Sequence, residues 1–260
     1  TGGYMSLPLI LAGKFLNLKI YLLEPNLVIG RANMFFLKFC EKIFCYNQHL
    51  KNFPEIFNQK KVIISPLVRK EFYGNELIAD NKKTRILIVG GSQGANIFDN
   101  SLKEIIVNLS KQFSIKVIQQ TSEKNISFLK EFYSNNDIEN EIFHYDKNFI
   151  SRILNSDICI TRAGATTLAE LSILLKPFIA VPLPTSKDNH QLENAVFYAK
   201  NNCCWVLEQS IFEREIEELL RKIFQNHADF YKKKENLKKL NYQNTWNNVN
   251  QKILKIINEN

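Results

Sequence analysis

The stretch "RILIVGGSQGAN", residues 85–96, places a glycine-rich turn directly after a run of β-forming residues. The segment that follows it, "FDNSLKEIIVNL", has helical spacing. A tight strand-to-helix turn uses glycines because the backbone bends sharply and approaches a ligand closely. The new helix presents unpaired N–H groups at its positive end, which suits an anion and most often a phosphate. Taken alone, the turn is equally compatible with a simple tight connection.

Short apolar runs alternate with helical patterns along the whole chain. This order predicts an α/β fold with parallel sheets and helices on both faces. The predicted strands are residues 19–24, 42–47, 61–65, 85–90, 115–120, 157–162 and 178–183. A length of 260 residues is closer to two domains than to one. The run 65–84 contains Pro66, Gly74 and a charged end, so we place the domain boundary near residue 69.

The apolar run near the start, residues 6–13, is too short to span a bilayer and lacks the flanks of a signal peptide. We therefore expect a cytoplasmic protein. The cysteines form an odd set without paired metal-ligand spacing, which is typical of reduced thiols in a core. They are Cys40, Cys45, Cys159, Cys203 and Cys204.

Positive charge is concentrated in the first part of the chain. Residues 1–70 hold ten Lys and Arg against three Glu, while the whole protein has a formal net charge of +8. A basic half of this kind suggests a polyanionic partner, either nucleic acid or an acidic membrane surface. The alternative is that the lysines simply lie on solvated faces. No nucleic-acid motif accompanies the charge. We predict a helix over 31–44 that places Phe35 and Phe39 near Lys38 and Lys42, which favours an anionic membrane surface or core packing.

A second turn, in "DICITRAGATTLAEL" (residues 157–171), repeats the arrangement of the first. A strand runs into Gly164, after which Thr166 or Thr167 is expected to cap a helix. We expect Glu170 in or near the first helical turn, where the helix dipole favours a carboxylate. An acid just beyond a phosphate turn can accept both hydroxyls of a ribose, although an isolated Glu there is also ordinary helix charge.

A third loop follows in "VPLPTSKDNHQLENA", residues 181–195. Gln191 and Asn194 suit sugar hydroxyls because each amide offers both donors and an acceptor. His190 is either catalytic or a hydrogen-bonding loop residue. All three loops leave the carboxyl ends of strands, where open α/β sheets bind their ligands. Together they predict a nucleotide-sugar site.

The chain resembles the MurG family through motifs that occur in that family's order and approximate spacing. These are "TGGYMSLP", "LEPNLVIGRAN", "SPLVR", "GGSQGAN", "RAGATTLAEL" and "VPLP…DNHQLENA". The resemblance implies an inverting glycosyltransferase of the GT-B fold, with two Rossmann-like domains facing a cleft. It implies transfer of GlcNAc from UDP-GlcNAc to undecaprenyl-linked lipid I, giving lipid II. It further implies a role in peptidoglycan synthesis, and so in cell shape and division, at the cytoplasmic face of the cell membrane as a peripheral protein.

The resemblance also assigns site residues, with no metal and no cofactor. It places Asn26 and Arg69 at the cleft, Asp146 with its backbone toward uracil, and Glu170 on the ribose. Gln191 and Asn194 would bind the GlcNAc hydroxyls. The remaining donor-side positions are Ser92, Gln93 and Gly94 in the diphosphate loop, then Ala165, Thr166, Thr167, Leu168 and His190. The acceptor-side positions are Gly2, Gly3 and Tyr4.

The motifs depart from the family in places, since "LEPN" stands for "HEQN", "SLP" for "SGP" and "IQQTS" for the region of "HQTG". The family's first glycine loop, with its candidate catalytic His, would lie upstream of residue 1, so the catalytic base stays unknown. We expect residues 1–69 to form an incomplete acceptor-side domain on which helix 245–260 packs, and residues 70–244 to bind UDP-GlcNAc. We therefore expect donor binding with little transfer. Alternatives are another UDP-sugar enzyme of the GT-B fold or a non-catalytic UDP-sugar-binding remnant.

Overall fold

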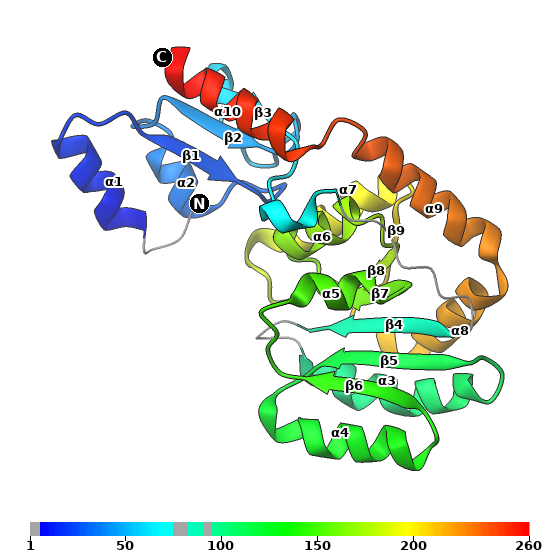
Figure 1. Ribbon diagram of the computed structural model, residues 1–260. Helices are drawn as coiled ribbons and strands as arrows, with labels where there is room; N and C mark the ends of the chain where they lie inside the picture. The colour runs from blue at the N-terminus through cyan, green and yellow to red at the C-terminus, as the bar shows by residue number, and fades with distance from the viewer. Residues whose placement is uncertain (1–5, 75–82, 91–94, 260) are drawn as a thin grey trace.

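The computed structural model describes residues 6–74, 83–90 and 95–259, and its strands form two parallel sheets. The three-stranded sheet has the order β1-β2-β3, and the six-stranded sheet has the order β6-β5-β4-β7-β8-β9. Figure 1 shows the two sheets as separate layers of one chain. All pairings between strands are parallel, as the alternation of strands and helices predicts.

The elements around the three-stranded sheet are short. They are α1 (Ser6–Phe15), β1 (Tyr21–Glu24), α2 (Arg31–Phe36), β2 (Lys42–Cys45), the 3-10 helix η1 (Glu55–Lys60) and β3 (Lys61–Ile63). A further 3-10 helix, η2 (Lys70–Phe72), lies in the segment that leads toward the second sheet. The helix predicted over 31–44 is wrong beyond Phe36, because residues 42–45 pair with β1 and β3 as a buried strand.

The six-stranded sheet alternates with longer helices. Its strands are β4 (Thr84–Val89), β5 (Ile115–Gln120), β6 (Glu139–Phe143), β7 (Ile158–Thr161), β8 (Phe178–Ala180) and β9 (Cys204–Val206). Its helices are α3 (Ala95–Ser110), α4 (Glu123–Asn135), α5 (Phe149–Leu154), α6 (Ala165–Ile173), α7 (His190–Lys200), α8 (Phe212–Gln225) and α9 (His227–Leu240), with the 3-10 helix η3 (Lys187–Asn189) before α7. Strands β6 and β9 were not predicted from the sequence.

Alternate residues of the central strand β4 face two different cores. Ile86 and Ile88 pack with α3, α4 and α8, whereas Leu87 and Val89 pack with α5, α6 and α7. Successive side chains of a strand point to opposite faces, so a continuous apolar run is what a doubly covered strand requires. The sheet thereby fixes where the loops after β7 and β8 emerge.

The last helix, α10 (Trp246–Glu259), returns to the three-stranded sheet. Val249 of α10 is buried in one cluster with Phe44 and Ile64, and Ile253 and Ile256 pack against that cluster. Figure 1 shows α10 lying across β2 and β3. The two ends of the described chain therefore share one structural unit.

All five cysteines are buried and free, as predicted for core thiols. Burial raises the pKa of Cys45 and of Cys204 to about 12, which keeps both thiols protonated and unreactive near neutral pH. In the described part of the chain, no helix combines the length and hydrophobicity needed to cross a membrane.

Candidate functional site

A pocket of about 660 Å³ lies between loops of the two sheets. On one side it is lined by Glu24, by the loop of residues 25–30, which we call the cleft loop, and by residues of α1 and α2. On the other side it is lined by Thr166, Lys187, Asp188 and His190. The carboxyl ends of β1, β7 and β8 thus open toward one space, where parallel sheets commonly bind ligands.

The turn of residues 162–165, which we call the α6 turn, directly precedes Thr166, which lines the pocket. Gly164 is the N-cap of α6, and no side chain caps the helix, so the predicted capping by Thr166 or Thr167 is wrong. The start of α6 therefore has no capping hydroxyl, and an uncapped helix N-terminus suits an anionic acceptor. Gly164 has a φ of −68°, which any residue can adopt, and a Cβ built on it meets no atom within 4 Å. Both its backbone and its surroundings therefore tolerate other residues.

Behind the α6 turn, Leu168 is fully buried in the core, so it can offer only its backbone to a ligand. Glu170 lies in the second turn of α6, next to the first turn and so near the predicted position. Its carboxylate is buried and lies 3.8 Å from Nε of Arg69. Burial raises the pKa of Glu170, while the Arg69 charge acts in the opposite direction. The structure therefore brings Arg69 and Glu170 together, although the two residues are a hundred positions apart.

The polar residues of α7 are already engaged by protein groups. Gln191 Oε1 accepts hydrogen bonds from the backbone N–H groups of Ala163 (3.2 Å) and Leu183 (3.0 Å). His190 places Nδ1 2.7 Å from the carbonyl oxygen of Lys187. Asn194 contacts Asn26, Leu27 and Ala163, and it is buried. Each of these side chains fixes a loop, whatever else it binds.

Asp146 lies in the loop between β6 and α5, and its carboxylate is held locally. It accepts hydrogen bonds from the backbone N–H of Asn148 (2.8 Å) and from Nε of Arg152 (2.7 Å). The hydrogen bond from the Asn148 N–H and then the one from Arg152 hold the pKa of Asp146 below its usual range. Two neighbouring donors of the protein thus engage the Asp146 carboxylate.

Several predicted positions fall outside the described residues. These are Ser92, Gln93 and Gly94 of the diphosphate loop and Gly2, Gly3 and Tyr4 on the acceptor side. The elements that flank the diphosphate loop, β4 and α3, are described and have the predicted strand-to-helix order. Within residues 6–74, 83–90 and 95–259, no group of three His, Cys, Asp or Glu side chains is placed to hold a metal ion.

Three buried polar residues of this region were not singled out from the sequence. Glu24 organises the cleft loop by accepting hydrogen bonds from Asn26, Gly30 and Asn33. Arg162 holds the α6 turn through Val181 O (3.2 Å) and Gln209 Oε1 (2.7 Å), and burial lowers its pKa. Asp99, on α3, accepts hydrogen bonds from three side chains. The only signal in the sequence was their position beside a glycine turn or at a strand end.

Comparison with known proteins gives one consistent family. Residues 85–249 match the model of the glycosyltransferase family 28 C-terminal domain. A protein of Pelagibacter ubique, named UDP-N-acetylglucosamine--N-acetylmuramyl-(pentapeptide) pyrophosphoryl-undecaprenol N-acetylglucosamine transferase, is 47% identical over all of this chain and 74% of its own length. A Rickettsia bellii protein of the same name is 34% identical over 86% of this chain and 65% of its own length.

The solved structure of Acinetobacter baumannii MurG superposes with a TM-score of 0.78 at 23% identity, covering 100% of this chain and 73% of that one. That likeness confirms the predicted α/β fold of the GT-B type. The match to the domain model and the 47% identity to a named relative decide the family. This chain belongs to glycosyltransferase family 28, and within it to the MurG family of N-acetylglucosaminyltransferases.

Proposed function

We propose that this protein transfers GlcNAc from UDP-GlcNAc to the muramyl 4-hydroxyl of undecaprenyl-linked lipid I, giving lipid II for peptidoglycan. The observation that carries the proposal is the pocket between the cleft loop and the side formed by Thr166, Lys187, Asp188 and His190, because a transferase needs both substrates to meet between its two halves. The names of the relatives support the identity of the substrates. Through peptidoglycan, the activity would serve cell-wall growth, cell shape and division.

The donor would lie along the carboxyl ends of β4, β7 and β8. The diphosphate would meet the start of α6 and the loop 91–94, and uracil would meet the backbone near Asp146. Gln191 would contact the hexose through Nε2, because its Oε1 already accepts two backbone N–H groups. The 4-hydroxyl would attack the anomeric carbon and form the new C–O bond, while the bond from that carbon to the diphosphate breaks with inversion and UDP leaves.

The Arg69–Glu170 pair has a place in this scheme. Ribose hydroxyls that bind Glu170 would take the position now held by Arg69. Because Arg69 is about half exposed, its guanidinium could then turn toward the diphosphate and stabilise the charge that develops as UDP leaves. We propose that donor binding exchanges these two partners of Glu170.

The activity is tested by incubating the protein with UDP-GlcNAc and a water-soluble lipid I analogue, then detecting lipid II and UDP by mass spectrometry. Lipid II formation that is lost in Glu170→Gln and retained in the exposed control Glu208→Gln would support the proposal. Epimerised UDP-sugar, or sugar transferred to a different acceptor, would instead identify another UDP-sugar enzyme of this fold. UDP-GlcNAc binding without any product would identify a non-catalytic binding protein.

We further propose that the lipid-linked acceptor is reached from an anionic membrane surface, at its cytoplasmic face. Large apolar side chains of α1, α2 and the segment after α1 are exposed, with Phe15 at 87%, Leu9 at 76% and Phe35 at 54%. Lys38 Nζ lies 5.1 Å from the ring centre of Phe35. Apolar side chains beside lysines suit the boundary of anionic headgroups and acyl chains.

Vesicle sedimentation tests this surface. We expect binding that increases with anionic lipid, weakens with salt and falls in the double variant Phe15→Ser/Phe35→Ser. The matched control is Phe128→Ser, a comparably exposed phenylalanine on α4 of the other sheet. Equal binding by the double variant and its parent would overturn the assignment.

The acceptor and donor sides of the proposed site correspond to the two sheets. We propose that residues 1–69 with helix 245–260 form the acceptor and membrane side, and that residues 70–244 form the donor side. Support comes from the packing of Val249 and Ile253 of α10 against the cluster that contains Phe44 and Ile64.

A further inference from the structure

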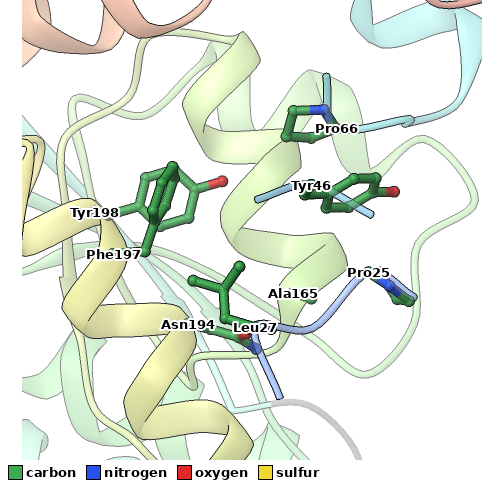
Figure 2. A pocket seen from close by; sticks show the side chains of 8 residues that line it. All are labelled: Pro25, Leu27, Tyr46, Pro66, Ala165, Asn194, Phe197 and Tyr198. Carbon is green, nitrogen blue, oxygen red and sulfur yellow. Dashed lines mark hydrogen bonds between the residues drawn. The ribbon is translucent and has the colours of Figure 1, made fainter. Parts of the chain in front are cut away.

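Asn194 of α7 joins the two sides of the cleft by hydrogen bonds alone. Its Oδ1 accepts from the backbone N–H of Leu27 (3.0 Å), and its Nδ2 donates to Asn26 Oδ1 (3.1 Å) and to the carbonyl of Ala163 (3.2 Å). The side chain is 3% exposed. Figure 2 shows Asn194 beside Leu27 of the cleft loop, with Ala165 at the start of α6 nearby. Both amide N–H groups and the amide oxygen are therefore used by the protein.

The cleft loop, to which Asn194 is hydrogen-bonded, is also held by the carboxylate of Glu24. Glu24, at the end of β1 and 2% exposed, accepts from the backbone and side-chain N–H groups of Asn26, both at 3.1 Å. Its second oxygen accepts from Gly30 N (2.7 Å) and Asn33 Nδ2 (2.9 Å). A Cβ on Gly30 would lie only 3.2 Å from this oxygen, so the loop fits closely around the carboxylate. A continuous chain of hydrogen bonds thus runs from β1 through Asn26 and Asn194 to the α6 turn.

Two ion pairs also connect the two sides of the cleft, one from α2 to η3 and one from Lys51 to α7, but they lie at the surface. Arg31 pairs with Asp188 at 3.3 Å, and Lys51 pairs with Glu193 at 2.8 Å. Both cationic side chains are more than half exposed. Exposed pairs contribute little to stability and are screened by salt. Buried hydrogen bonds are different, because breaking them leaves polar groups without partners or admits water.

We propose that Asn194 is a positioning residue that fixes the separation of the cleft loop from the α6 turn before substrates bind. The proposal rests on the bonds of Asn194 to Asn26, Leu27 and Ala163. The expectation that Asn194 also contacts the GlcNAc hydroxyls stays a prediction. The catalytic consequence rests on the proposed transferase function. A wall that shifts by about an ångström misplaces the acceptor hydroxyl relative to the anomeric carbon, at a large cost in rate.

The separation is measured in the free protein by electron–electron double resonance between spin labels at Gln59→Cys, beside the three-stranded sheet, and Lys130→Cys on α4. Both positions are exposed, and the five native thiols are buried, so labelling is confined to the introduced cysteines. Asn194→Ala removes all three bonds, and Asn194→Asp keeps the acceptor for Leu27 N while removing both donors. The matched control is Asn201→Ala, at the other end of α7, whose Nδ2 bonds only its own helix at Phe197 O.

We expect a broader distance distribution in both Asn194 variants and an unchanged one in Asn201→Ala. We also expect kcat to fall by about tenfold or more. Unchanged distances in both variants, with melting temperatures near the parent's, would overturn the proposal. An inactive parent would count against the proposed function alone, since the distances need no substrate.

Discussion

Asp99 gives the sharpest test of what holds the start of α3 in place. It lies on α3, which begins directly after residues 91–94, and its carboxylate is 3% exposed. Its oxygens accept from Gln119 Nε2 (2.8 Å), Thr121 Oγ1 (2.5 Å) and Asn125 Nδ2 (2.9 Å). The carboxylate therefore ties α3 to the end of β5 and to the start of α4.

The size of the effect follows from burial. In Asp99→Leu the donors of Gln119 and Thr121 stay buried without an acceptor, at about 1–3 kcal/mol each. Asn125 is half-buried and can turn to water, and removal of a buried charge returns part of the loss. We expect a net loss of about 3 kcal/mol in the free energy of unfolding, and about 1–2 kcal/mol in Asp99→Asn, which keeps one oxygen.

Urea unfolding monitored by tryptophan fluorescence measures this loss. A Trp246→Phe background leaves Trp205 of β9 as the reporter, and Trp205 belongs to the six-stranded sheet. The control is Glu104→Leu, an exposed position on the same helix, with an expected change within about 0.5 kcal/mol. UDP affinity should also weaken in the folded Asp99 variants. A loss under about 1 kcal/mol in Asp99→Leu, with an unchanged m-value, would show that the three bonds contribute nothing net.

Three further predictions concern titration and specificity. Glu170→Gln should weaken UDP binding by about 1–3 kcal/mol in calorimetry if Glu170 holds the ribose. The same variant should be more stable than its parent at pH 7 and lose that advantage toward pH 4, because burial raises the pKa of Glu170 and folding therefore disfavours its ionised form. Burial lowers the pKa of Lys176 to about 8 in the folded protein. Between pH 8 and the usual pKa of a lysine, Lys176 is therefore more protonated in the unfolded chain than in the folded one. The stability of the parent relative to Lys176→Met should therefore rise with pH in that window, by at most about 1.4 kcal/mol per pH unit in urea titrations. Asp146→Ala should keep its preference for UDP over ADP in competition binding, since the carboxylate is occupied by Asn148 and Arg152, and loss of that preference would show that the side chain reads the base.

Within the six-stranded sheet, the strands that the sequence predicted, β4, β5, β7 and β8, are the inner ones, and most of their residues are buried. The two strands it missed, β6 and β9, are the edges of the six-stranded sheet. β6 alternates charged residues, with Glu139 and Glu141 paired to Lys116, and β9 is three residues long. Edge strands are commonly short or charged, because this prevents pairing with another chain. The features that protect an edge also remove the apolar pattern by which a strand is recognised.

Local helix signals failed where tertiary contacts decided the outcome. The segment 31–44 has apolar residues at helical spacing, yet residues 42–45 complete a parallel ladder and the helix ends at Phe36. At α6, two threonines follow a glycine, which favours a capping hydroxyl by spacing alone. The structure instead places Gly164 at the N-cap and starts the helix one residue later. Spacing locates a turn within a few residues, but the register of the cap depends on how the helix packs.

The candidate site shows the same boundary between what residue types determine and what they leave open. An amide in a polar loop is equally suited to sugar hydroxyls and to the backbone, because hydroxyls both donate and accept, while backbone N–H groups donate and C=O groups accept. The sequence therefore predicts that Gln191 and Asn194 make polar contacts, but it does not determine whether their partners are sugar hydroxyls or backbone groups of the protein. The structure adds the protein contacts: Asn194 is buried and meets backbone groups from both sides of the cleft, whereas Gln191 is half-buried at the start of α7. These contacts depend on the pairing of loops that are distant in the chain, which residue types and spacing do not determine.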